Sequence, residues 1–359
     1  MTLAAIAIAL LVIGGPAQQR SNDLTRAGWE ALNAGRLQDA AAAFTASLEH
    51  GPAPHALLGA ALVAHLQTRY EQARQHLVAA LNLDPSLTPA TVLLGEVLYR
   101  LGDLDSAILT YEQALTRDPD QPQLLKKLGT WRKELMLHSR FGQRFSDHFT
   151  VLFEGPAEAA LAERAAGILE AAYWRVGTAL QCYPDDVVTV VLYTREQFRD
   201  ITQSPEWAGG AFDGRIRVPV QGALQNVAEF ERVLIHEFTH ALVHSLAPRG
   251  VPAWLNEGLA VLFEGADLTR QREQVRSAPA VPALDRLERS FEKLGPGQAR
   301  VAYALSAVAA AALMEQAGAA AVVNLLTAIG HGVPFPAAFE SHCLMSYAEF
   351  QKRLHDDDR

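Results

Sequence analysis

The sequence contains few cysteines and fewer basic than acidic residues. Its two cysteines, Cys182 and Cys343, are far apart and match neither a redox motif nor a metal-binding pair. Two interpretations stay open for them, a disulfide in an exported protein or two buried thiols. With 31 Lys and Arg against 40 Asp and Glu, the net charge of −9 argues against nucleic acid as a main partner.

The apolar run at the N-terminus is too short to span a bilayer comfortably. Residues 2–17 carry no charged side chain and are mostly Ala, Ile, Leu and Val, which suits the apolar region of a signal peptide. Gly15, Pro16 and Ala17 supply small residues for cleavage. We therefore predict a signal peptide or membrane anchor over residues 1–20 and an extracytoplasmic protein, with an ordinary apolar helix or a misplaced start codon as the alternatives.

Residues 21–140 contain a repeat. Equivalent positions 33 and 34 residues apart hold Ala40, Ala73 and Ala107, then Phe44, Leu77 and Tyr111, and then Pro52, Pro85 and Pro119. Gly35, Thr68 and Gly102 are also equivalent. In a paired-helix repeat, small residues let the helices approach, a large apolar residue fills the seam, and proline ends the unit.

This pattern resembles three tetratricopeptide repeats. A further helix over residues 122–139 is expected to cap them, with Leu128, Trp131 and Leu135 facing the last repeat. The resemblance implies an all-α solenoid over residues 21–140, with a surface for a protein partner or a segment of substrate. The alternative is a scaffold that only stabilises the following domain.

The strongest chemical motif is His236-Glu237-Phe238-Thr239-His240, a match to H-E-x-x-H. Apolar residues at three- and four-residue steps predict a helix here, which Pro248 and Gly250 end. On a helix, the two imidazoles lie on one face about 6 Å apart and can hold a zinc ion from one side. Glu237, beside the first histidine, takes the position of a general base.

A catalytic zinc needs a third protein ligand and one open position. Glu257 lies on the next predicted helix, which the turn over residues 248–252 can fold back onto the histidines. His244 continues the histidine face, but one straight helix can hardly present three side chains to one ion. Glu264, two turns beyond Glu257, is expected to face away.

The segments HEFTHAL and WLNEGLA, at residues 236–242 and 254–260, resemble the gluzincin metallopeptidases. The closer resemblance is to the bacterial peptidase MA-like group, often fused to tetratricopeptide repeats, and it extends over residues 145–355. It implies that His236, His240 and Glu257 bind one Zn²⁺ per chain and that Glu237 is the catalytic base. It also implies a zincin-like domain over residues 141–359, so that the whole chain is α+β.

Alternating apolar residues predict strands at 148–153 and 187–193, with helices at 156–180 and 194–203. Asp213-Gly214 signals a hairpin turn. Residues 215–218 after the turn alternate, and Pro219 at their end suggests an edge strand. The gluzincin resemblance assigns substrate binding to residues 214–218. Arg215 and Arg217 there either contact a substrate carboxylate or are solvated. Helices are expected at 284–294, 301–317, 319–329 and 347–354.

The oxyanion of peptide hydrolysis usually needs a donor besides the metal. Tyr303 is our candidate, because it is a polar-tipped aromatic on an otherwise small, apolar helix; the alternative is a packing tyrosine, and His331 is the weaker candidate. We predict a zinc peptidase acting on peptides or proteins. An endopeptidase is favoured because no motif for an α-amine clamp is visible. The alternative is a catalytically silent, repeat-based scaffold or chaperone-like protein.

Overall fold

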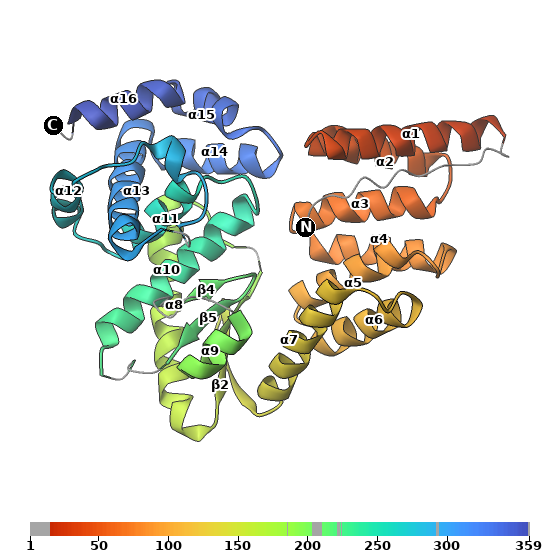
Figure 1. Ribbon diagram of the computed structural model, residues 1–359, viewed down its shortest axis with the longest axis horizontal. Helices are drawn as coiled ribbons and strands as arrows, with labels where there is room; N and C mark the ends of the chain where they lie inside the picture. The colour runs from red at the N-terminus through yellow and green to blue at the C-terminus, as the bar shows by residue number, and fades with distance from the viewer. Residues whose placement is uncertain are drawn as a thin grey trace. The chain divides into compact units, whose positions relative to one another are not determined.

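The structure is a computed structural model that describes residues 15–184, 186–202, 210–220, 223, 225–291 and 294–357. The chain forms two compact units, of which the first ends at Leu135 and the second begins at Met136 (Figure 1). The predicted α+β fold is confirmed, with helical repeats followed by a small mixed sheet and helices. Residues 1–14 of the predicted signal segment lie outside the described residues, and helix α1 begins at Pro16.

Three helix pairs and one further helix make up the repeat region. The bounds are Pro16–Asn33 for α1, Leu37–Glu49 for α2, Pro54–Leu66 for α3, Tyr70–Leu83 for α4, Thr88–Arg100 for α5, Leu104–Arg117 for α6 and Pro122–His138 for α7. Gly35, Thr68 and Gly102 turn the chain inside the pairs with φ of 75°, 56° and 87°. The sequence equivalence of these three positions thus reflects one left-handed turn.

Large side chains fill the seams between the repeat helices, as predicted. The Phe44 ring lies so close to Gly28 and Gly59 that a Cβ at either glycine would come within 2.6 Å of it. At the last repeat, Trp131 of α7 stacks on Tyr99, with ring centroids 4.7 Å apart. Trp131 is buried there, so α7 covers the end of the last repeat, as the sequence predicted.

The second unit contains a five-stranded sheet in the order β1-β2-β3-β5-β4. Its central strands β2, β3 and β5 are parallel, and β1 and β4 run antiparallel at the edges. The bounds are Phe141–Phe145 for β1, Phe149–Glu154 for β2, Val188–Tyr193 for β3, Ala211–Phe212 for β4 and Ile216–Pro219 for β5. The strands predicted at 148–153 and 187–193 are β2 and β3, and β1 was not predicted.

The prediction that residues 214–218 form an edge strand is wrong. In β5, Ile216 pairs with Val190 of β3 on one side and with Phe212 of β4 on the other. The turn at Asp213 and Gly214 folds β4 back over the outer side of β5, so β4 is the edge. Pro219 and the alternating pattern could not reveal this, because they do not specify a strand's neighbours.

The interpretation that the two arginines of this hairpin are solvated is also wrong. Arg217 is fully buried, and Arg215 is 7% exposed. The guanidinium of Arg217 donates to Asp213 Oδ1 at 3.0 Å and to the hydroxyl of Tyr193 at 2.8 Å. Arg217 therefore ties the hairpin to β3 and is not placed to meet a substrate carboxylate.

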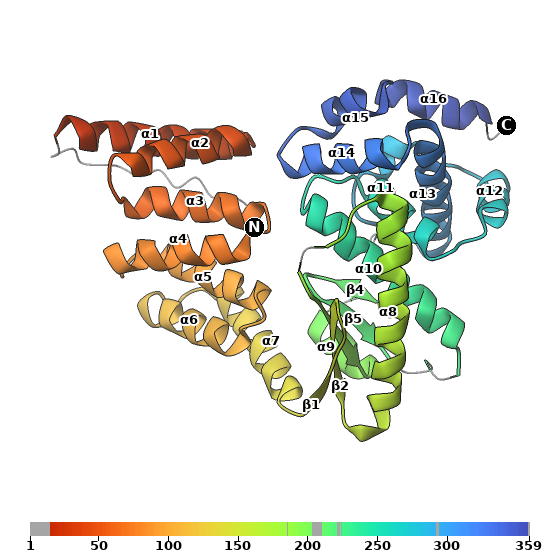
Figure 2. The ribbon, with the colours of Figure 1, turned by 180° about the vertical axis from the view of Figure 1, so that it is seen from behind.

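Alternating residues of β3 serve the two faces of the sheet. Val190 and Leu192 pack into a core with α8 and α10, while Val191 and Tyr193 pack against α9 on the other face. The bounds are Ala159–Leu180 for α8 after the 3₁₀ turn Pro156–Glu158, Arg195–Thr202 for α9 and Val227–Leu246 for α10. Figure 2 shows α8 running along the sheet.

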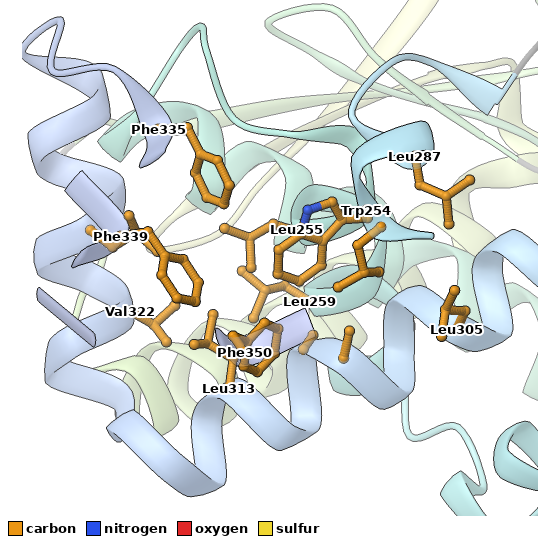
Figure 3. Packing of buried hydrophobic residues seen from close by; sticks show 14 of the residues in the cluster. Trp254, Leu255, Leu259, Leu287, Leu305, Leu313, Val322, Phe335, Phe339 and Phe350 are labelled. Atoms are coloured by element: carbon orange, nitrogen blue, oxygen red, sulfur yellow. The ribbon is translucent and has the colours of Figure 1, made fainter. Parts of the chain in front are cut away.

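A second core is entirely helical. It surrounds Trp254 and Leu259 of α11, as Figure 3 shows. Its helices are Ala253–Phe263 (α11), Leu268–Arg276 (α12), Pro296–Ala317 (α13), Ala319–Gly330 (α14), Phe335–Cys343 (α15) and Tyr347–Asp357 (α16). Where a helix was predicted at 284–294, the described residues include a 3₁₀ turn at Leu284–Leu287 and no α-helix before Pro296, and α12 and α15 were not predicted. By length and composition α13 could cross a membrane, yet 56% of that stretch is buried, as in a core helix.

Helix α10 lies where these two cores meet. Its apolar residues between Phe230 and Leu242 pack toward the sheet, and Val243 packs with Ala247 into the helical core. Figure 1 shows α10 between the sheet and the helices α11 and α13. The motif helix is thus held from both sides by buried apolar contacts, which keeps its polar face in one orientation.

The close approach of α11 and α13 at Gly258 gives a test of this packing. A Cβ at Gly258 would lie 2.2 Å from the carbonyl oxygen of Ser306, so Gly258→Ala should lower the free energy of unfolding by about 1–3 kcal/mol. The matched control is Gly167→Ala on α8, where a Cβ meets nothing within 4 Å and should add about 0.5–1 kcal/mol. Urea denaturation of the full chain would measure both; equal shifts would contradict the close packing.

Candidate metal centre

Helix α10 presents His236 and His240 on one face, as predicted. Asn226 begins the helix, because its side chain accepts a hydrogen bond from the Glu229 backbone N–H at 3.1 Å. The two imidazole rings have centroids 4.7 Å apart and are nearly perpendicular. One helix turn therefore brings two nitrogen donors to one point.

The turn after α10 returns the chain to these histidines. Gly250 adopts a φ of 82° there, and Pro252 begins α11. As a result, Glu257 Oε2 lies 3.4 Å from His236 Nε2 and 3.5 Å from His240 Nε2. The donor atoms of these three residues all lie within 4.8 Å of one another, so the three could hold a metal ion.

Glu264 does not face away from the site, contrary to the prediction. Its Oε2 lies 2.8 Å from His236 Nδ1 and also 2.8 Å from a guanidinium nitrogen of Arg232. Glu257 and Glu264 are seven residues apart, and the chain between them brings both carboxylates to the same imidazole. Glu264 thereby orients His236 with Nε2 toward Glu257.

Asn256 gives the second histidine a similar support. Its side-chain oxygen lies 3.1 Å from His240 Nδ1. Each imidazole thus has its Nδ1 engaged and its Nε2 directed at the common point. Asp267, three residues beyond Glu264, instead accepts a hydrogen bond from the backbone N–H of Thr269 at the start of α12.

Two other histidines do not join the group. His244 is not part of the three-residue cluster, and its ring lies edge-on to Phe212 with centroids 5.2 Å apart. His331 is the exposed residue that ends α14, and it lines neither of the cavities described below. Glu257 is therefore the predicted third ligand that the structure brings to His236 and His240.

Glu237 is buried beside the cluster. Its side chain is 5% exposed, and Oε2 has no hydrogen-bond partner among the described residues. The backbone of Gly210 presses on it, since a Cβ at Gly210 would lie 2.6 Å from Glu237 Oε1. Burial raises the pKa of Glu237, which suits a carboxylate that gains and loses a proton.

The charges of the group fit a divalent cation. Burial disfavours protonated imidazole, but the Glu257, Glu264 and Glu237 carboxylates outweigh it and raise the pKa of His236 to about 10. Burial opposes ionisation of Glu257 as well, yet the two imidazoles hold its pKa well below the usual range. Glu257 Oε2 has no hydrogen-bond partner among the described residues. A cation bound by the three donors would replace the imidazole protons.

Two cavities open at the group. One, of about 410 Å³, is lined by His240, His244 and Glu257, and the other, of about 340 Å³, by Arg232, Glu264 and Arg300. Gly210, His236, Glu237 and Tyr303 line both. Tyr303, the predicted oxyanion donor, therefore lies at the wall of the site. Its ring packs on Phe291 in a T-shaped contact.

The sequence matches the profiles of known protein families in both units of the chain. The sequence profile of the Peptidase MA superfamily matches residues 175–352, which include the whole cluster. Two tetratricopeptide-repeat profiles match residues 25–88 and 64–129. The chain is a tetratricopeptide-repeat protein with a Peptidase MA superfamily domain. No curated protein matches it.

Among solved structures, the repeats are similar to one described as the first TPR of Spaghetti (RPAP3) bound to the HSP90 peptide SRMEEVD. The identity is 21%, the match covers 33% of this chain and 98% of that one, and the TM-score is 0.32. A likeness this weak carries no argument about what the repeats bind.

Three features of the peptidase MA domain were not predicted from the sequence: the close approach of Gly210, the contact of Glu264 with His236 and the pairing of Arg232. Gly210 precedes a strand just before the motif helix, and a glycine in that place is a signal of close backbone approach. The spacing of Glu264 from Glu257 gave a signal too, since two full turns return a side chain to nearly the same face. Arg232, which pairs with Glu264, had no signal in the sequence.

The role of Glu264 can be tested through metal affinity. Glu264→Gln removes the charged acceptor of His236 Nδ1 and should weaken metal binding about 10- to 100-fold. Competition between the protein and a chelator for Zn²⁺ or Co²⁺ would measure it. Glu273→Gln on α12, an exposed position outside the site, is the matched control. Equal affinities of the two variants would exclude a supporting role for Glu264.

Proposed function

We propose that the chain is a zinc-dependent peptidase that hydrolyses peptide bonds. The observation that carries the proposal is the convergence of His236, His240 and Glu257 beside the buried Glu237 carboxylate, whose Oε2 has no hydrogen-bond partner among the described residues. A merely structural site would not need a buried carboxylate oxygen without a hydrogen-bond partner at the edge of an open cavity.

The donor set favours zinc. Two imidazole nitrogens and one carboxylate oxygen are the ligands of many catalytic zinc sites, and three protein ligands leave a fourth position for water or substrate. When bound there, zinc would act as a Lewis acid and lower the pKa of a coordinated water.

The protein's own groups would handle the protons. Glu237 would take a proton from the attacking water and pass it to the leaving amine, and its raised pKa suits both steps. The Tyr303 hydroxyl, at the wall of both cavities, would donate a hydrogen bond to the developing oxyanion.

Substrate binding is assigned to the observed edge strand. Ala211 and Phe212 of β4 line the first cavity together with Gly210. An extended peptide could pair with the outer edge of this strand, which no other strand of the described residues covers. Two cavities meet at the shared residues and offer room for substrate beyond one terminal residue, which favours an endopeptidase over an aminopeptidase.

The remaining parts of the proposal rest on the repeats and on the sequence. Tetratricopeptide repeats precede the domain, and we propose that they recruit a substrate segment or a protein partner. Because residues 2–17 are apolar and uncharged, we further propose a secreted, periplasmic or membrane-anchored bacterial protein.

Metal content and hydrolysis measured on the same samples test the enzyme. The full chain should contain about one zinc per chain and cleave casein. Glu257→Ala should lose most of the metal, because it removes one of three ligands. Glu237→Gln should keep the metal and lower the rate by a factor on the order of 10³ or more, because it removes the base.

His244→Ala is the control for Glu257→Ala, as it removes a nearby cavity histidine outside the ligand group. It should keep the zinc. Full zinc in Glu257→Ala together with loss in His244→Ala would reverse the ligand assignment. Zinc without any hydrolysis in the parent would favour the scaffold or chaperone-like alternative.

The proposed role of Tyr303 gives a separate prediction. Tyr303→Phe removes only the hydroxyl and keeps the ring that packs on Phe291, so the fold and the metal content should not change. If the hydroxyl stabilises the oxyanion, kcat should fall about 10²- to 10³-fold with a small change in KM. A kcat within a few-fold of the parent would make Tyr303 a packing residue.

A further inference from the structure

The second cavity has a polar wall that the proposed chemistry does not use. Gln271 and Gln274 lie one turn apart on α12 and are half-buried, and Arg300 lies on α13 one turn before Tyr303. All three line the cavity of about 340 Å³, together with Gly210 and Val233. Two helices thus direct two amides and a guanidinium to one side of the metal centre.

Arg300 differs from the other arginine of this cavity. Arg232 pairs with Glu264 at 2.8 Å and with Glu229 at 2.6 Å, so its charge is committed to these carboxylates. No salt bridge or hydrogen bond in the described part of the chain involves the Arg300 side chain, which is exposed. The Arg300 guanidinium can therefore pair with an anionic group of a ligand in the cavity.

The side-chain amides of Gln271 and Gln274 are likewise available to a ligand. No hydrogen bond within the described ranges involves the side-chain amide of Gln271 or Gln274, although both are partly withdrawn from water. A carboxylate accepts hydrogen bonds from a guanidinium and from amide N–H groups together, and bonds to the charged acceptor are the stronger ones. A basic side chain would instead meet Arg300 with a charge of the same sign.

We infer that this cavity is the binding pocket for a carboxylate-bearing residue next to the cleaved bond, with Arg300 as the residue that determines specificity. The inference rests on the proposed peptidase function and adds the substrate class to it. The carboxylate is either the side chain of Asp or Glu or the free C-terminus of the peptide. Arg300, rather than the buried Arg215 and Arg217, meets the acidic group.

A peptide series tests the pocket. An alanine-based octapeptide with a fluorophore and a quencher at its ends carries Glu, Gln or Lys in turn at each inner position, with its C-terminus as free acid or amide. The parent should cleave the Glu or free-acid form about tenfold or more faster than the neutral form, at one position relative to the cleaved bond. Arg300→Met should remove this preference through KM and leave kcat for the Gln peptides within a few-fold.

Two controls separate Arg300 from general charge effects. Arg276→Met removes an exposed arginine at the end of α12 that lines neither cavity, and it should keep the preference. Arg249→Met removes an arginine at the other cavity. A preference that survives in Arg300→Met, or that Arg249→Met abolishes instead, overturns the assignment.

A binding measurement keeps the test independent of turnover. Fluorescence anisotropy of the same peptides, without quencher, is measured with zinc-loaded Glu237→Gln and with Glu237→Gln/Arg300→Met. The Glu or free-acid peptides should bind about tenfold tighter than their neutral forms to the first protein only. Equal binding of all forms refutes the pocket. Selective binding by Glu237→Gln, when the parent cleaves none of these peptides, refutes the peptidase proposal and retains the pocket.

Discussion

The Glu257 carboxylate lies between two imidazoles, 3.4 Å and 3.5 Å from their Nε2 atoms, and the peptidase MA domain depends on this contact. Buried ionisable groups are costly unless they are paired, so neither the histidines nor the carboxylate could stay at this depth alone. The domain brings them together by a sharp return of the chain between α10 and α11. Close packing of Gly258 on α13 then holds the second helix against its neighbours.

The same contact explains why the motif helix lies at the junction of two cores. Its first turns pack toward the sheet, and its last turn packs with α11 and α13. The sheet side carries Gly210 and β4, and the helical side carries Glu257 and Tyr303. The site at this junction therefore combines residues from the sheet side and the helical side, and residues of both sides line the first cavity.

Electrostatic support extends outward from the centre in a defined order. Glu264 engages His236, Arg232 engages Glu264, and Glu229 engages Arg232 near the surface. Each charge has a partner of opposite sign, which limits the cost of burial. Glu237 departs from this order, as its Oε2 has no hydrogen-bond partner among the described residues. Glu237 is also the group to which the proposed mechanism gives a proton.

Residue spacing along the chain was enough to predict several features of this protein. The repeats, the motif helix and the return of Glu257 depend on intervals that a helix translates directly into faces. The edge strand and the partners of Glu264 and Arg217 were predicted wrongly or not at all. A strand carries no mark of which neighbour it pairs with, so the folding of β4 over β5 could not be read from the pattern. Likewise, the contact of Glu264 with His236 arises from the packing of two helices, which depends on every residue between them.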